Sequence, residues 1–149
     1  MPRDDLLKGR VSLPGQAYHI TTCTEGRRPL FQDFRNGRLL VTEMRQLNDA
    51  KLVNSLAWVI MPDHLHWLFQ LDEQLNLSDL VKKLKARSSL AINACIGRQG
   101  SVWQRGFHDH AIRRDEDLRA VARYIIANPL RAGLVEHIGD YPLWDAIWL

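Results

Sequence analysis

The most regular hydrophobic pattern in this chain lies at residues 64–71, where large apolar side chains alternate with other residues. One set of alternate positions is Leu65, Trp67, Phe69 and Leu71, and the other is His64, His66, Leu68 and Gln70. A period of two is typical of a half-buried β-strand, whose successive side chains point to opposite faces. We therefore predict a strand that presents four large apolar residues to a core. The two histidines then project together from the opposite face.

The residues around this strand predict the other elements. Pro62 and Asp63 are typical turn residues, so 53–61 and 64–71 should form a β-hairpin with the histidine pair just after its turn. Runs of β-forming residues predict further strands at 18–23 and 107–112. Helical spacing of apolar residues predicts three helices. Their ranges are 33–50, 78–96 and 115–128, with Asp33, Ser78 and Asp115 as N-caps.

The predicted order of elements is β-α-β-β-α-β-α. Its first six elements match a split βαβ, or ferredoxin-like, arrangement, so the predicted fold class is α+β. Two helices would cover one face of the sheet, and the additional C-terminal helix would lie against the face from which His64 and His66 project. We expect a single domain over residues 1–149, with a loose lead-in at 1–16 and a tail at 136–149 that packs back on the domain.

Composition narrows the class of protein only slightly. Hydrophobic residues make up 46% of the chain and charged residues 25%, as in globular proteins, which argues against disorder. The formal net charge of +3 permits a nucleic-acid partner without requiring one. Two isolated cysteines, no apolar run long enough to span a membrane and no signal-peptide profile lead us to expect a cytoplasmic protein.

The candidate chemistry centres on the histidine pair and the third predicted helix. Tyr124 and Asn128 are four residues apart, so they are neighbours on one helix face. Two imidazoles and the Asn128 amide oxygen could hold a divalent ion, with Tyr124 beside it. Such an ion would withdraw charge from a phosphodiester, which a phenol needs because it is a weak nucleophile at neutral pH. Without that helix, two histidines on a strand are more simply explained as solvent-exposed residues.

Basic side chains mark candidate phosphate contacts. They lie in the loop after the first strand, on the second helix and just after the third. The residues are Arg27, Arg28, Lys82, Lys83, Lys85, Arg87 and Arg131. A charge cluster on a helix is usually a solvated edge, so phosphate contact by the helical residues depends on an active site nearby.

Three segments together resemble the single-tyrosine HUH transposases, and most closely the REP-associated tyrosine transposases. The segments are Met61-Pro62-Asp63-His64-Leu65-His66-Trp67-Leu68, Trp103-Gln104-Arg105-Gly106-Phe107 and Tyr124-Ile125-Ile126-Ala127-Asn128-Pro129-Leu130-Arg131-Ala132-Gly133-Leu134-Val135. The resemblance covers about residues 18–141. The motifs in this order are specific, whereas His-x-His alone is not.

This resemblance implies that His64 and His66 bind a metal ion, Mg²⁺ or Mn²⁺, and that Tyr124 is the nucleophile. Asn128 stands where insertion-sequence relatives commonly have Gln, which fits the REP-associated branch. Members of the family cut single-stranded DNA at hairpins through a 5′-phosphotyrosine and leave a free 3′-hydroxyl. The REP-associated branch implies repetitive extragenic palindromes as the substrate, and a monomer that acts at the nucleoid.

Two other functions are compatible with these residues. His108 or His110 could be a third ligand in a His₃ zinc hydrolase, but Tyr124 and Asn128 would then have no role. The second is a non-catalytic ferredoxin-like nucleic-acid-binding module. Such modules stack bases on aromatic residues of the open sheet face, whereas the aromatic residues of 64–71 share the predicted core face. Metal-dependent nicking distinguishes the transposase-like function from the binding module, and metal preference distinguishes it from the hydrolase.

Overall fold

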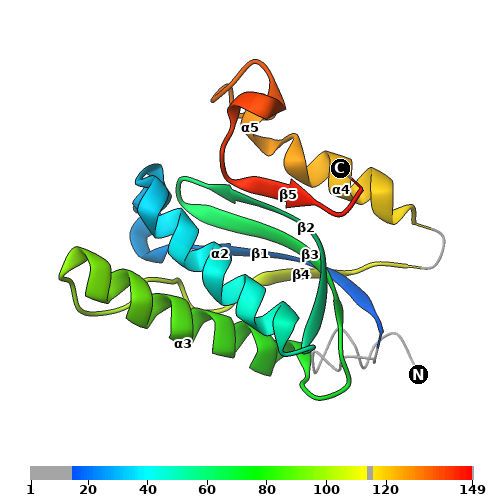
Figure 1. The fold of residues 1–149 in the computed structure, drawn as a ribbon, viewed down its shortest axis with the longest axis horizontal. Helices are drawn as coiled ribbons and strands as arrows, with labels where there is room; N and C mark the ends of the chain where they lie inside the picture. The colour runs from blue at the N-terminus through cyan, green and yellow to red at the C-terminus, as the bar shows by residue number, and fades with distance from the viewer. Residues whose placement is uncertain (1–14, 114–115, 149) are drawn as a thin grey trace.

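A computed structural model describes residues 15–113 and 116–148, which form a five-stranded sheet with helices on both faces (Figure 1). The strands are β1 (Ala17–Cys23), β2 (Val53–Met61), β3 (His64–Leu71), β4 (His108–Ala111) and β5 (Trp144–Ala146). Their order in the sheet is β4-β1-β3-β2-β5, and each neighbouring pair is antiparallel. The predicted ranges of the central hairpin strands, 53–61 and 64–71, are confirmed.

The helices lie as the sequence predicts, two on one face of the sheet and the third on the other (Figure 1). The first face carries α2 (Phe34–Asp49) and α3 (Leu77–Ile96), and the second carries α4 (Leu118–Ile126) and the short α5 (Asn128–Arg131). Single 3₁₀ turns are η1 (Glu25–Arg27), η2 (Leu30–Gln32) and η3 (Ile138–Asp140). The element order up to β4 is β-α-β-β-α-β, which confirms the predicted ferredoxin-like α+β fold.

The main core lies between the sheet and the pair α2 and α3. The four alternate apolar residues of β3 all belong to it, and their exposed fractions are 0% for Leu65, Trp67 and Phe69 and 1% for Leu71. Complete burial of a side chain of this size stabilises the fold by about 1.5–3 kcal/mol. The one polar atom of Trp67 is paired as well, because its indole N–H donates to Ser55 Oγ at 2.9 Å.

A second apolar cluster holds α4 against the opposite face. Ala122 and Ile125 of α4 are buried there together with Val59 of β2 and Leu68 of β3. Leu68 lies two residues after His66 and therefore on the same side of the sheet. The packing of a few apolar side chains thus brings α4 to the face that carries the histidines.

The helix boundaries confirm one of the predicted caps and correct another. The Asp33 side chain accepts a hydrogen bond from the Arg35 backbone N–H and caps α2 as predicted. The prediction of Ser78 as the cap of the second helix is wrong, because the Asn76 side chain accepts from the Asp79 N–H and the cap lies two residues earlier. An asparagine is as good a cap as a serine, so local sequence does not separate the two. Asp115 lies outside the described residues, and the N-cap of α4 is Asp117.

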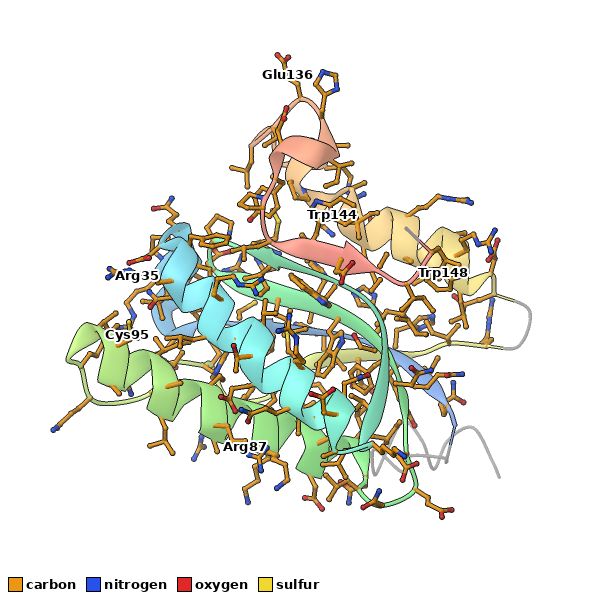
Figure 2. All side chains as sticks on the ribbon, in the orientation of Figure 1. Arg35, Arg87, Cys95, Glu136, Trp144 and Trp148 are labelled. Atoms are coloured by element: carbon orange, nitrogen blue, oxygen red, sulfur yellow. The ribbon has the colours of Figure 1, made fainter. Side chains whose placement is uncertain are left out.

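The C-terminal segment packs back on the domain as a fifth strand. β5 pairs with β2 antiparallel, with Val59 opposite Trp144 and Ala57 opposite Ala146. Trp144 and Trp148, both labelled in Figure 2, pack against the apolar cluster that holds α4. Within the described residues, no helix is both long and apolar enough to cross a membrane.

Candidate active site

His64 and His66 project from the sheet face on which α4 packs. Their cross-strand neighbours on β1 are Cys23 and Thr21, and all four side chains lie on this face. The two imidazole rings are 4.9 Å apart between centroids and meet edge to face, at 79°. The predicted strand therefore places both rings over the same small area of the sheet.

The ring of His64 is oriented by the carboxylate of the residue before it. Its Nδ1 lies 2.7 Å from Asp63 Oδ1, and Asp63 Oδ2 accepts from Arg27 Nε at 2.9 Å. Burial acts to raise the pKa of Asp63, but the hydrogen bonds from His64 and Arg27 outweigh it and hold that pKa below its usual range. Asp63 is therefore an anion at neutral pH, and it fixes the His64 ring with Nδ1 directed away from the site.

The ring of His66 is oriented by two side chains of the neighbouring strand β1. Its Nδ1 lies 3.0 Å from His19 Nε2 and 3.1 Å from Thr21 Oγ1. Burial lowers the pKa of His66 to about 3, and the charges of His19, His64 and Arg131 add to this effect. Burial also lowers the pKa of His19 to about 4, with a smaller contribution from His110. The rings of His66 and His19 are therefore both neutral at pH 7. For His66 this is the form in which an imidazole binds a metal.

These contacts are the arrangement expected of metal-binding histidines. Such residues usually place one ring nitrogen against a carboxylate or other partner, which directs the second nitrogen toward the ion. Within the described residues, the Nε2 atoms of His64 and His66 make no hydrogen bond, so both are available as ligands. The donor set fits a divalent cation with further positions for water, phosphate or a third protein ligand.

The predicted third ligand, Asn128, begins α5 just after α4 ends. Its side-chain Nδ2 donates to the Ile125 carbonyl at 2.7 Å, which holds the amide against the end of α4. Its Oδ1 atom accepts no hydrogen bond from the described residues and remains a predicted ligand. The break between α4 and α5 lies just before Pro129, which has no backbone N–H to donate to the Ile125 carbonyl four residues earlier.

Tyr124 is the one exposed tyrosine of three in the chain. Its exposed fraction is 63%, whereas Tyr18 is buried in the main core at 3%. The Tyr141 hydroxyl donates to the Ile60 carbonyl at 2.6 Å, and burial raises the pKa of Tyr141 to about 12. The geometry therefore leaves Tyr124 as the tyrosine that a DNA phosphate can reach.

Arg131 stacks on the ring of Tyr124. Its guanidinium carbon lies 3.9 Å from the centre of the Tyr124 ring, a stacked cation–π contact. The charge of Arg131 also makes the smallest of four contributions that lower the pKa of His66. A guanidinium in this position can bind a phosphate oxygen with two parallel hydrogen bonds.

The other predicted phosphate contacts are spread over two sides of the molecule. Arg27 pairs with Asp63 beside His64, but Arg28 donates to the carbonyls of Glu25 and Ser101. The four basic residues of α3 lie in the helical layer beneath the opposite sheet face, and Figure 2 shows Arg87 projecting from that helix. Contact with DNA stays a prediction for all seven residues.

The His₃ alternative receives no support from the geometry. His110 Nε2 lies 3.0 Å from the Glu116 carboxylate, and both His108 and His110 are exposed on the edge strand β4. In residues 15–113 and 116–148, no three His, Cys, Asp or Glu side chains are placed to hold a metal together.

The sequence analysis missed the role of His19. This residue lies between Tyr18 and Ile20, both buried in the main core, so period-two alternation along 18–23 places His19 on the histidine face. Alternation therefore indicated the correct face. The partner of His19 depends on the register between β1 and β3, which the local sequence does not determine.

The fold and the site together define the class of protein. The family described as "Transposase IS200 like" matches residues 12–128, most of the chain, and the chain belongs to this family. Its relatives include the REP-associated tyrosine transposase of Escherichia coli (strain K12), which is 31% identical over 117 residues. That alignment covers 72% of this chain and 67% of the relative.

Two further proteins are similar to this chain. A putative REP-associated tyrosine transposase of Haemophilus influenzae is 35% identical over 98 residues, which cover 59% of this chain and 56% of that protein. The solved structure of a REP-associated tyrosine transposase bound to a REP hairpin aligns with a TM-score of 0.72 at 25% identity. That alignment covers 89% of this chain and 77% of the chain in the solved structure. The resemblance to REP-associated tyrosine transposases is thereby confirmed.

Proposed function

We propose that this protein is a metal-dependent single-stranded DNA endonuclease and strand transferase that acts at hairpins of repetitive extragenic palindromes. One observation carries the proposal: the exposed Tyr124, with Arg131 stacked on its ring, lies on the helix that packs on the sheet face of His64 and His66. The candidate nucleophile, the candidate phosphate-binding group and the two candidate metal ligands are thus carried by one sheet face and the helical segment packed on it. The solved relative bound to a REP hairpin supports the choice of substrate. The direct test is a covalent protein–DNA adduct at Tyr124.

His64 and His66 would hold a divalent ion, Mg²⁺ or Mn²⁺, through their Nε2 atoms, and Asn128 Oδ1 is the candidate third ligand. When bound, the ion supplies Lewis-acid activation and orientation of the scissile phosphate. The protein's own part is to hold the ligands in place and to keep the His66 imidazole neutral. Asp63 fixes the ring of His64, and His19 and Thr21 fix the ring of His66.

The covalent step assigned to Tyr124 is an in-line displacement at phosphorus. The Oη atom loses its proton to water and forms a bond to the phosphorus atom. The bond to the 3′-oxygen breaks, and that oxygen takes up a proton to leave a free 3′-hydroxyl and a 5′-phosphotyrosine. Attack of a 3′-hydroxyl on the phosphotyrosine reverses the step and rejoins DNA without another energy source. Arg131 would hold the phosphate beside the phenol ring throughout.

Hairpin DNA with an unpaired tail should bind much more tightly than plain duplex. The active site and the other candidate cations lie on two sides of the domain, which suits a flexible strand better than a straight helix. If three to five cations contact phosphates, the logarithm of affinity should fall with the logarithm of salt concentration with a slope of about −2 to −4. A gel-shift titration at several salt concentrations measures the affinity for each DNA and the slope of affinity with salt. Equal affinity for the two DNAs at every salt concentration would contradict the proposal.

Removal of the His19 side chain should weaken metal binding. In the His19→Ala variant the buried Nδ1 of His66 keeps only Thr21 as a partner, so the ring is less firmly oriented. We expect Mn²⁺ affinity to fall by about 10-fold, at the low end of the effect of such outer partners. His19→Gln, which retains a hydrogen-bonding group, should recover part of the Mn²⁺ affinity that His19→Ala loses. The measurement is a Mn²⁺ titration without DNA, and equal affinities in all three proteins would exclude a positioning role for His19.

The proposal extends to the state and place of action of the protein. We propose that it acts as a monomer on chromosomal palindromes, in the cytoplasm at the nucleoid. The packing of α4, which carries Tyr124, on the histidine face of the same chain supports this proposal. Light scattering of the protein with and without hairpin DNA tests the monomeric state.

A further inference from the structure

The turn between β2 and β3 is held in place by the segment 24–31. Pro62 and Asp63 form this turn. The Pro62 carbonyl accepts a hydrogen bond from the Phe31 N–H at 3.0 Å, and the Asp63 carbonyl accepts one from the Thr24 N–H at 2.9 Å. Thr24 itself is completely buried. The backbone of the turn that leads into the histidine strand is therefore fixed from outside the hairpin.

Arg27 has an unusual backbone conformation within this segment. Its φ is 53°, in the left-handed region that residues with a Cβ atom seldom adopt. Two hydrogen bonds keep the local turn closed. The Arg27 N–H donates to the Thr24 carbonyl at 3.0 Å, and Thr24 Oγ1 donates to the Arg28 carbonyl at 2.8 Å. A long side chain kept in such a conformation by its surroundings indicates a functional reason for its position.

The side chain of Arg27 bonds to the two strands beside the histidine site. Its Nε donates to Asp63 Oδ2 at 2.9 Å, and its Nη1 donates to Cys23 Sγ at 3.3 Å. The other oxygen of the same carboxylate, Asp63 Oδ1, lies 2.7 Å from His64 Nδ1. Arg27 therefore holds one carboxylate oxygen and leaves the second one for the imidazole. The guanidinium fixes the rotation of the carboxylate, and the carboxylate fixes the ring.

We propose that Arg27 is a positioning residue of the metal site, which acts through Asp63 to keep His64 Nε2 directed toward the metal ion. This inference rests on the proposed function for the metal ion. The Arg27 side chain is 54% exposed, and so exposed an ion pair contributes little to stability. Stability therefore does not account for the strained backbone, whereas the geometry of His64 does. A phosphate contact alone would leave the metal affinity of the DNA-free protein unchanged.

Two neutral substitutions separate the hydrogen bond of Arg27 from its charge. In Arg27→Gln, the side-chain Nε2 stands the same number of bonds from the backbone as Arg27 Nε, so it can still donate to Asp63. Arg27→Asn is one carbon shorter and falls short of Asp63. In a Mn²⁺ titration without DNA, Arg27→Asn should bind about 5-fold more weakly than Arg27→Gln, less than the roughly 10-fold effect of a direct partner of a metal ligand.

Thermal unfolding distinguishes this role from a purely structural one. Asn adopts the left-handed conformation more readily than Gln, so Arg27→Asn should unfold at a temperature at least as high as Arg27→Gln. The order of stability is thus opposite to the expected order of Mn²⁺ affinity. If Arg27→Asn does not fold, Arg27→Gly replaces it, because glycine suits this φ best and also leaves Asp63 without its partner.

Lys51 provides the matched control. Its φ is 61°, and it lies near Val53, which pairs with Leu71 at the end of the hairpin opposite to His64. Lys51→Asn and Lys51→Gln remove the same charge from the same backbone conformation. They should show the same order of stability as the substitutions of Arg27 and bind Mn²⁺ with equal affinity.

The route through Asp63 is tested in the Asp63→Ala background. Without the carboxylate, Arg27→Gln and Arg27→Asn should bind Mn²⁺ equally, because the two positions act as one unit. The inference is wrong if the two substitutions bind equally with Asp63 present, or if their difference persists in Asp63→Ala. Absence of Mn²⁺ binding by wild type would overturn it together with the metal site. Failure of the proposed covalent step shows differently: the difference in Mn²⁺ affinity would persist while no adduct forms at Tyr124.

Discussion

Replacement of Tyr124 by Phe should abolish cleavage of a single-stranded hairpin while leaving the fold and DNA binding intact. The substitution removes one oxygen atom from a side chain that is 63% exposed, so little packing is lost. The phenyl ring can still stack against Arg131, which lies 3.9 Å from the ring centre. Because the lost atom is the assigned nucleophile, the cleavage rate should fall by at least about 10³-fold. Single-turnover cleavage of labelled hairpin DNA with Mn²⁺ measures this rate.

The matched control is the same substitution at Tyr141. That hydroxyl donates to the Ile60 carbonyl, so Tyr141→Phe should cost about 1 kcal/mol of stability through one lost hydrogen bond. Its cleavage rate should nevertheless stay close to that of wild type. If Tyr124→Phe kept substantial activity, water would be the nucleophile and the assignment of Tyr124 would be wrong.

Replacement of both His64 and His66 by Ala should have an equally large effect, through loss of the metal ion. Neither residue belongs to the main core, so the double variant should fold. It should bind no Mn²⁺ in a titration without DNA and show no metal-dependent cleavage. Addition of EDTA to the wild-type protein should give the same loss of cleavage.

Two exposed histidines on the same sheet provide the control for this result. His108→Ala and His110→Ala should each keep Mn²⁺ binding and cleavage, because their strand β4 is separated from the strand of the histidine pair by β1. Loss of metal in either variant would instead favour the three-histidine hydrolase. Unchanged cleavage in the His64/His66 double variant would exclude these residues as the metal ligands.

The sequence predicted those parts of the fold that depend on local pattern. The alternation at 64–71 and the Pro62–Asp63 turn were sufficient for the bounds of the central hairpin and for the face of its histidines. The order of elements then predicted the ferredoxin-like sheet and the position of α4 over that face. Tyr124 could be chosen among three tyrosines because only that residue lay on a helix able to reach the histidines.

The parts that the sequence did not predict depend on contacts between distant segments. His19 orients His66 across 47 positions of the chain, a pairing set by strand register. Lys85 could be predicted as a cation on a helix edge, but its bonds to Gln104 and Gly106 form only when the segment that carries these two residues packs on α3.

Identification of the residue that becomes attached to DNA tests the central claim most directly. Wild-type protein is incubated with Mn²⁺ and a hairpin labelled on either side of the cleavage site, then denatured, digested and analysed by mass spectrometry. We predict one adduct, with the 5′-phosphate of the downstream product on Tyr124, a free 3′-hydroxyl on the other product, and no adduct in EDTA. An adduct at another residue, an adduct through the 3′-phosphate, or cleavage without any adduct would contradict it.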